Sequence, residues 1–188
     1  MGRVQALIRG TTVALMLSVS LAACGGGGGD EKSVSTPAGF QSAKTDDFSV
    51  ALPSGWKVDR KAEQGGQGVF VEARPPGSDI NRAQLRVASA RNYKSDINAA
   101  VLLAEGEIPV RRPGATRVVS KTITVPGASD ARRIEWTVPA GGGIEPARIV
   151  TVLALSSDKT LVNLSMGVSA SQVAGARIDD VVRSLRVG

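Results

Sequence analysis

The sequence predicts an α+β fold in which an antiparallel β-sheet is packed with helices. Several short segments alternate apolar and polar residues, which is typical of half-buried strands, and turn signals rich in glycine and proline separate them. Two other segments carry apolar residues at helical spacing. The order is strands, helix, strands, helix, and the connections between strands are short. We therefore expect hairpins rather than regular strand–helix alternation.

The first predicted strands lie on either side of a Pro-Ser-Gly turn. Phe48 to Leu52 and Trp56 to Arg60 both alternate apolar and polar residues, which predicts a hairpin around residues 53–55. Its inward face would carry Phe48, Val50, Leu52, Trp56 and Val58. We therefore expect Trp56 in the core rather than in a ligand cleft, where it could stack on a sugar ring.

Two further strands and a helix come next. Gln67 to Arg74 and Ala83 to Arg91 are predicted strands. Ser95 or Asp96 can cap the start of the helix, and Gly106 is expected to end it. The stripe that this helix would bury consists of Ile97, Ala100, Val101 and Ala104.

The second half of the chain repeats the pattern. Strands are predicted over Thr116 to Val125 and Asp130 to Pro139, followed by a glycine loop at Gly141 to Gly143. Arg148 to Leu155 and Thr160 to Val168 form the clearest predicted hairpin. A last helix would bury Ile178, Val181, Val182 and Leu185, and it runs into a short apolar end.

The N-terminal segment predicts a secretory signal. Arg3 and Arg9 precede an uncharged, largely apolar run from Thr11 to Ala23, which is too short to span a bilayer. The following Leu21-Ala22-Ala23-Cys24 resembles the lipobox of bacterial lipoproteins. In that family the cysteine sulfur receives a diacylglyceryl group, and a peptidase then cuts before it.

The lipobox resemblance implies cleavage between Ala23 and Cys24, lipidation of Cys24 and attachment to membrane lipid through fatty acyl chains such as palmitate. The protein would then lie on the extracytoplasmic face of the cell membrane. The alternative is a free thiol near an ordinary cleavage site. Two acyl chains give stable anchoring where one is marginal.

The sequence divides into three parts. Residues 1–23 are the predicted lipoprotein signal peptide, and residues 24–44 are a predicted disordered, glycine-rich tether, because they contain too little apolar surface to offset the entropy of ordering. Such a coil has a reach of roughly 25 Å. Residues 45–188 are the predicted α+β globular domain, long enough to be stable without disulfides or metals.

Two local patterns in this domain resemble a known family. FSVALPSGW near its start and a closing helix that runs into SLRV are similar to the PsbP/Mog fold, and especially to LpqN-type lipoproteins, which carry such a domain behind a lipobox. The resemblance implies an α-β-α sandwich and a noncatalytic accessory or interaction role. No family-wide site motif exists, so no binding residues carry over.

Charge gives a mild basic bias. The formal net charge is +6, and it falls to +4 once Arg3 and Arg9 leave with the signal. This balance is compatible with anionic headgroups or wall polymers and does not indicate nucleic acid. The basic pairs are expected to be solvated surface rather than a binding patch; they are Arg60-Lys61, Arg111-Arg112 and Arg132-Arg133.

The residue types present indicate no catalytic site. The chain has no histidine, which excludes Ser-His-Asp and Cys-His catalysis and the usual zinc ligand sets. Asp46-Asp47 and Asp179-Asp180 are adjacent pairs, expected as caps or solvated surface because neighbouring side chains point in different directions. Ser54 and Lys57 match Ser-x-x-Lys, but in a turn rather than at a helix start. We expect no metal site and no cofactor.

Trp136 is expected on the same strand face as Ile134, so both belong to the core unless a bulge intervenes.

Three functional hypotheses remain, in decreasing order of preference. The first is a lipid-anchored, noncatalytic envelope lipoprotein that acts as an interaction or accessory module for another envelope protein. The second is a binding or carrier protein that holds a hydrophobic or anionic small ligand between sheet and helix. The third is an envelope hydrolase that uses carboxylate chemistry.

Overall fold

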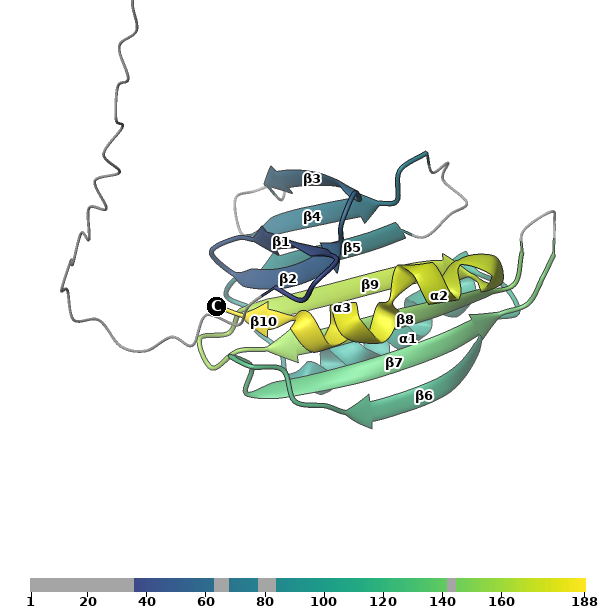
Figure 1. The fold of residues 1–188 in the computed structure, drawn as a ribbon. Helices are drawn as coiled ribbons and strands as arrows, with labels where there is room; N and C mark the ends of the chain where they lie inside the picture. Colours follow the sequence, from purple (N-terminus) through teal and green to yellow (C-terminus); the bar gives the residue numbers. More distant parts are fainter. Residues whose placement is uncertain (1–35, 63–67, 78–83, 142–144) are drawn as a thin grey trace, which may run out of the picture. The chain divides into compact units, whose positions relative to one another are not determined.

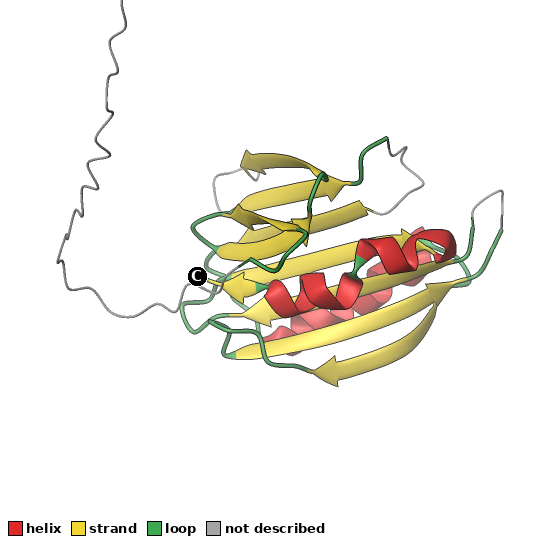
Figure 2. Ribbon diagram, in the orientation of Figure 1, coloured by secondary structure: helices red, strands yellow, loops and turns green. Residues whose placement is uncertain are grey.

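The computed structural model describes residues 36–62, 68–77, 84–141 and 145–188 (Figure 1). Residues Ser35–Gly188 form one compact unit. Figure 2 shows strands with a small number of helices, which confirms the predicted α+β class. The predicted signal peptide and the first part of the tether lie outside the described residues.

Most strands belong to one antiparallel sheet of seven strands in the order β3-β4-β5-β9-β8-β7-β6. The strands are β3 (Lys57–Ala62), β4 (Val69–Arg74), β5 (Gln84–Ala90), β6 (Thr116–Thr122), β7 (Asp130–Val138), β8 (Ala147–Leu155) and β9 (Leu161–Ser169). The predicted hairpin of residues 148–155 and 160–168 is confirmed as β8 and β9, which pair over their whole length. At its turn Lys159 takes a left-handed conformation, with φ of 67°.

A second, three-stranded sheet has the order β1-β2-β10. Its strands are β1 (Phe40–Lys44), β2 (Phe48–Pro53) and β10 (Arg186–Val187). The helices are α1 (Ile97–Arg111), the short 3-10 helix η1 (Ala170–Gln172), α2 (Val173–Ala176) and α3 (Ile178–Ser184).

The helices cover both faces of the large sheet, as the predicted sandwich requires. Successive β8 residues point to opposite faces. Val150, Val152 and Ala154 pack in one cluster with Val181 and Leu185 near α3 and with the small sheet. Ile149, Leu153 and Leu155 pack in the other with Ile97 and Ala100 of α1. Figure 1 shows α3 in front of the sheet and α1 behind it.

The predicted hairpin of residues 48–52 and 56–60 is wrong. β2 pairs with β1 and β10, whereas β3 pairs with β4, so the turn at Gly55 carries the chain from one sheet to the other. Alternation correctly predicted the buried side chains but could not say which strand each would pair with. Phe48, Val50, Leu52 and Trp56 are buried, and Val58 is partly buried.

The folded part begins earlier than Thr45. β1 lies inside the segment expected to be tether, and it buries Phe40 and Ala43 against the core. Only these two apolar side chains of β1 are buried, which is too weak a pattern to predict a strand.

Helix α1 is longer than predicted. Asp96 caps it as expected, since its Oδ1 accepts a hydrogen bond of 3.0 Å from the Ala99 amide. Gly106 does not end it, because Ile108 extends the sheet-facing stripe by another turn. The helix closes at Arg112, whose amide donates to the Ile108 carbonyl at 2.8 Å.

Three segments far apart in sequence meet at β10. The Val187 amide donates to the Pro126 carbonyl at 2.9 Å, and the Gly188 amide donates to the Asp47 carbonyl at 3.0 Å. Gly127 lies against the Val187 backbone with φ of 84°, and a Cβ on Gly127 would overlap the Val187 carbonyl. The loop after β6 and the strand β10 therefore fit together only with glycine at this position.

Gly127→Ala should lower the free energy of unfolding by about 2–3 kcal/mol, because it combines a left-handed backbone with a steric overlap. Chemical denaturation measures this change. Gly106→Ala is the control: nothing lies near its added Cβ on the exposed side of α1, and we expect it to stabilise the protein by about 1 kcal/mol. Equal effects of the two substitutions would contradict the close approach at β10.

Candidate binding surfaces

The site residues predicted from the sequence, Ala23 and Cys24, lie outside the described residues. The described domain presents two surfaces of different chemistry on opposite faces of the large sheet. One is the outer side of α1, and the other surrounds α2 and α3.

The outer side of α1 is apolar. Leu102, Leu103 and Val110 are 70%, 71% and 80% exposed, although α1 also buries a stripe against the sheet. Leu103 and Val110 are seven residues apart, so they lie on the same side of the helix. Helical spacing predicted only the buried stripe, because Leu102 and Leu103 fall outside it.

Charged pairs with balanced signs border these apolar side chains. Glu105 forms an ion pair with Arg117 of β6, and it accepts a hydrogen bond from Ser120. Glu107 pairs with Arg111 one turn further on, at 2.7 Å. The outer side of α1 therefore has an apolar centre bordered by these two ion pairs and by the exposed Arg112, and an apolar centre with a polar rim is usual for a protein-binding surface.

The opposite face of the sheet carries a partly buried charge cluster. Glu135 of β7 accepts hydrogen bonds from Arg133 Nε at 2.7 Å and from Arg148 Nη2 of β8 at 2.6 Å. Arg133 also donates to Asp179 of α3 at 2.6 Å. The side chains of Glu135 and Arg133 are only 8% and 12% exposed. Because charges so far from water need partners, this network fixes α3 on β7.

The charge cluster contradicts the expectation that Arg133 is solvated surface. It also brings Asp179 and Asp180, which were expected to point in different directions, to one site. Arg133 is not solvated surface, because β7 places Arg133 and Glu135 on one face and Asp179 covers them. Arg111 and Arg112 are exposed as expected. Asp179 and Asp180 bind different arginines, yet both line one cavity.

The cavity is shallow and has a volume of about 350 Å³. Its charged lining comes from Arg148, Arg177, Asp179, Asp180 and Arg183, and its apolar lining comes from α2 and the start of α3. Asp180 is shared between Arg177, at 2.7 Å, and Arg183. A hydrogen bond from Arg133 lowers the pKa of Asp179, and one from Arg177 lowers the pKa of Asp180. Both carboxylates are therefore ionised at neutral pH.

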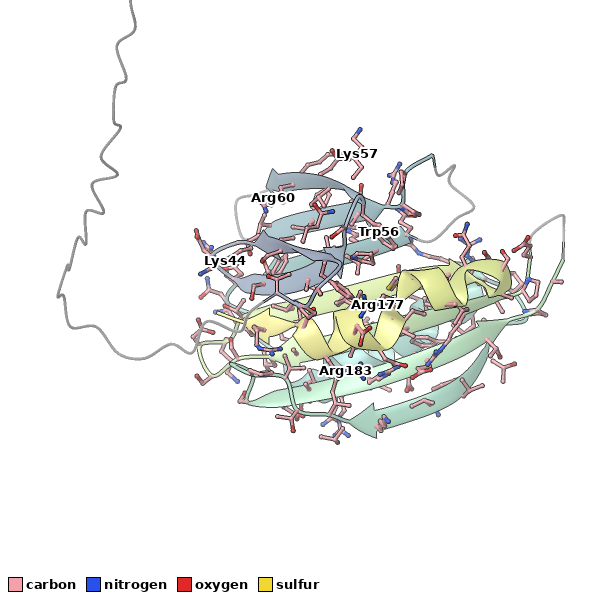
Figure 3. The ribbon with its side chains drawn as sticks, viewed as in Figure 1. Lys44, Trp56, Lys57, Arg60, Arg177 and Arg183 are labelled. Atoms are coloured by element: carbon pink, nitrogen blue, oxygen red, sulfur yellow. The ribbon has the colours of Figure 1, made fainter. Side chains whose placement is uncertain are left out.

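Arg177 joins this cavity to the start of the folded domain. It takes a left-handed conformation between α2 and α3, with φ of 48°. Its guanidinium lies over the Phe40 ring, 4.2 Å from the ring centre, and Nη1 donates to the Ala38 carbonyl at 3.4 Å. Figure 3 shows Arg177 and Arg183 beside α3. The chain thus enters the domain at the edge of the cavity.

Asp47 is a further correction. It is buried rather than solvated, and it accepts hydrogen bonds from Ser89 Oγ at 2.6 Å and Arg91 Nε at 2.7 Å. The hydrogen bond with Asp47 raises the pKa of Arg91. Because Ser89 and Arg91 lie more than forty residues away, no local pattern could predict this contact. The interaction ties the β1–β2 turn to β5. Asp46, by contrast, is exposed.

Other sequence expectations concern the tryptophans and metal ligands. Trp136 and Ile134 are both fully buried in the α1-side core, which confirms that they share a face. Trp56 is also buried, so it offers no stacking surface. The described residues contain no group of three or more side chains that could hold a metal ion. Over the same residues, no helix has the length and apolar character needed to cross a membrane.

Comparison with known proteins identifies the fold. The sequence matches no protein-family model, and no curated protein matches it significantly. The solution structure of cyanobacterial PsbP (CyanoP) from Synechocystis sp. PCC 6803 is similar, with a TM-score of 0.56 and 14% identity over 89% of this chain and 99% of that chain.

Two further solved structures are similar to this chain. LpqN of Mycobacterium tuberculosis, described as involved in cell envelope biogenesis, has a TM-score of 0.51 and 12% identity over 79% of this chain and 91% of that chain. The Ran-binding protein Mog1p of Saccharomyces cerevisiae has a TM-score of 0.50 and 12% identity over 79% of this chain and 95% of that chain. At such identities the similarity shows the fold alone, and it confirms the PsbP/Mog-like fold.

Glu135→Gln should destabilise the domain by about 3 kcal/mol, because it leaves Arg133 and Arg148 partly buried without the carboxylate that neutralises them. Urea denaturation of the purified protein measures the loss. Glu107→Gln removes an exposed pair with Arg111 and should cost less than about 0.5 kcal/mol. If the two variants were equally stable, the cluster would not fix α3 on the sheet.

Proposed function

We propose that the protein is a lipid-anchored envelope lipoprotein that binds another envelope protein as a noncatalytic accessory module. The observation that carries this proposal is the outer side of α1, where Leu102, Leu103 and Val110 are all more than two-thirds exposed on one helix. Scattered exposed apolar residues are common, whereas a group on one element that is bordered by charged pairs is typical of an interaction site.

The geometry of α1 favours a protein partner with an apolar groove. A helix docks in such a groove through apolar residues at intervals such as seven, which is the interval between Leu103 and Val110. The ion pairs Glu105–Arg117 and Glu107–Arg111 would border the groove, and their balanced signs favour a partner of mixed charge over a polyanion.

The similar structures support this proposal by analogy. Mog1p is described as Ran-binding, so one protein with this fold binds a protein partner. LpqN is described as acting in cell envelope biogenesis, which matches the location proposed for this chain.

The proposed anchor would direct α1 away from the membrane. Acylation of Cys24 follows from the resemblance of Leu21 to Cys24 to a lipobox. The chain enters the domain beside Arg177 on the α3 side of the sheet, and α1 packs on the other side. A partner in the envelope could then reach α1 while the acyl chains held the opposite side near the lipid.

The carrier hypothesis receives weaker support. The cavity beside α3 is lined mainly by charged side chains and is open, so it fits the anionic ligand of this hypothesis, but it does not enclose a hydrophobic ligand between sheet and helix.

Expression of the full chain in a bacterial host that acylates lipoproteins tests the anchor. We expect the mature protein to begin at Cys24, to carry the mass of attached acyl chains and to partition with membranes. Cys24→Ala should lack the acyl mass. A wild-type protein that is cut elsewhere and carries no acyl group would refute the anchoring proposal without affecting the role of α1.

Substitution on α1 tests the interaction. Leu103→Glu and Val110→Glu should each abolish an in-cell crosslink to an envelope protein that the wild type captures repeatedly, because a carboxylate would have to be desolvated in the apolar groove. Ser157→Glu, in the exposed turn between β8 and β9, is the control and should retain the crosslink. Circular dichroism would verify folding. Retention of the same crosslink by folded Leu103→Glu and Val110→Glu would exclude α1 as the binding surface.

A further inference from the structure

We infer that the surface around the α2–α3 cavity binds the phosphate groups of an anionic lipid bilayer and so orients the domain on the membrane. The direction of this orientation rests on the proposed anchoring at Cys24. The binding itself does not require the acyl chains and can be measured without them.

The charged side chains in and beside the cavity carry a net positive charge, which favours an anionic ligand. Arg133, Arg148, Arg177 and Arg183 face three carboxylates, those of Glu135, Asp179 and Asp180, so one positive charge is in excess. On the other side of the sheet, Glu105 pairs with Arg117 and Glu107 with Arg111, and Arg112 adds one exposed charge at the end of α1, whereas Arg148, Arg177 and Arg183 line a single hollow. The excess charge favours a phosphate group over a neutral ligand.

The arginines of the cavity have N–H groups that their ion pairs do not use. A guanidinium has five N–H groups in a planar fork that suits phosphate oxygens. Arg148 uses two of its nitrogens to donate to Glu135. Arg177 uses one for Asp180 and one for the Ala38 carbonyl, and Arg183 uses one for Asp180. The side chain of Arg183 is 71% exposed, so its remaining donors face solvent. Phosphate oxygens can therefore be bound without breaking the pairs with Asp180 and Glu135.

Further basic residues extend the surface beyond the cavity. Lys44 at the end of β1 and Arg60 of β3 are both exposed, and Figure 3 labels them together with Arg177 and Arg183. Arg186 follows α3 and donates only to backbone carbonyls among its described contacts. The exposed acids of this region include Asp46, in the β1–β2 turn, Glu145, which accepts from Ser171, and Asp179, which pairs with Arg133. The positive charges are thus spread over a surface, which suits many headgroups better than one small anion.

The N-terminal end of the folded domain lies next to the cavity. Arg177 contacts both Phe40 and the Ala38 carbonyl, so the segment that comes from Cys24 joins the domain at the cavity edge. Thirteen residues lie between Cys24 and Ala38, and the flexible tether that the sequence predicts there would have an r.m.s. reach of roughly 20 Å. An acylated Cys24 would therefore hold this surface, rather than α1, close to the headgroups.

The contact should be electrostatic and shallow. The exposed large apolar side chains of the described residues are Leu102, Leu103, Val110 and Val118, and all four belong to α1 and β6. None of them lies on α2 or α3. The surface has basic side chains to place at the headgroups and nothing large to insert among acyl chains, so binding should weaken as salt rises.

Vesicle cosedimentation of residues 24–188 with Cys24→Ser tests the inference. This chain contains the whole compact unit Ser35–Gly188 and cannot be acylated. We expect binding to vesicles of phosphatidylcholine with about one-third phosphatidylglycerol, and little binding to phosphatidylcholine alone, with loss of the difference as salt rises from about 0.05 M to about 0.5 M. Equal binding to both vesicle types, or none to either, would overturn it.

A matched pair of variants locates the contact. Arg183 and Arg111 are both exposed arginines, 71% and 73%, and each pairs with an acid on its own helix. Removal of one contacting basic charge lowers partitioning roughly fivefold. We expect this loss for Arg183→Gln, a larger one for Arg183→Gln with Lys44→Gln, and no change for Arg111→Gln. Equal losses for Arg183→Gln and Arg111→Gln would show attraction by net charge and refute the assigned surface.

Inorganic phosphate distinguishes a bilayer from a free anion. At constant ionic strength, replacement of chloride by phosphate should leave vesicle binding unchanged if the surface binds many headgroups at once. Displacement by millimolar phosphate would indicate a small-anion site and overturn the bilayer assignment. Since the protein in these measurements is not acylated, their failure is separate from failure of lipidation at Cys24 or of the crosslink through α1.

Discussion

The burial of β8 on both faces is the constraint on which this fold depends. Residues Ile149 to Leu155 are all buried, so the strand must be covered from both sides. Helix α1 covers one side, and α3 with the small sheet covers the other. Many antiparallel sheets leave one face exposed to water. This sheet cannot do so at β8, because β8 carries apolar side chains on both of its faces. The two layers that cover β8 therefore present separate outer surfaces, which are free to differ in chemistry.

The two outer surfaces differ because the elements beneath them are held in different ways. Helix α1 packs through a narrow stripe that includes Ile97 and Ala100, so the rest of its circumference can carry the largely exposed Leu102 and Leu103. Helix α3 buries Ile178, Val181 and Val182, and it is also tied to β7 through Asp179 and Arg133. Glu135 is buried on this side, and its charge is neutralised by Arg133 and Arg148. The charge of the α3 surface is thus partly a result of how the helix is attached.

The sequence predicted well what depends on neighbouring residues. Alternation found the strand segments, and helical spacing with Asp96 as cap found the start of α1. The β8–β9 hairpin was predictable because its two strands follow each other in the sequence, with a short turn between them, and pair with each other. Contacts between distant segments were not predictable: β2 follows the same alternation as a hairpin strand but pairs elsewhere, and Asp47 meets Ser89 from the other sheet. The cluster of Arg133, Glu135, Arg148 and Asp179 combines three elements, and each of its residues alone has the appearance of ordinary surface charge.

The pairing of β10 with β2 has a consequence for how the domain forms. Phe48 lies opposite Val187, and the Asp47 carbonyl accepts from the Gly188 amide, so the small sheet joins segments about 140 residues apart. Such long-range contacts are slow to form, since the loop between them must be closed first. A chain that emerges N-terminus first cannot complete this sheet until residue 187 is available. Until then β2 lacks its β10 partner and its contacts with α3, so the side chains that it buries in the complete domain stay partly uncovered in a chain that is still being synthesised.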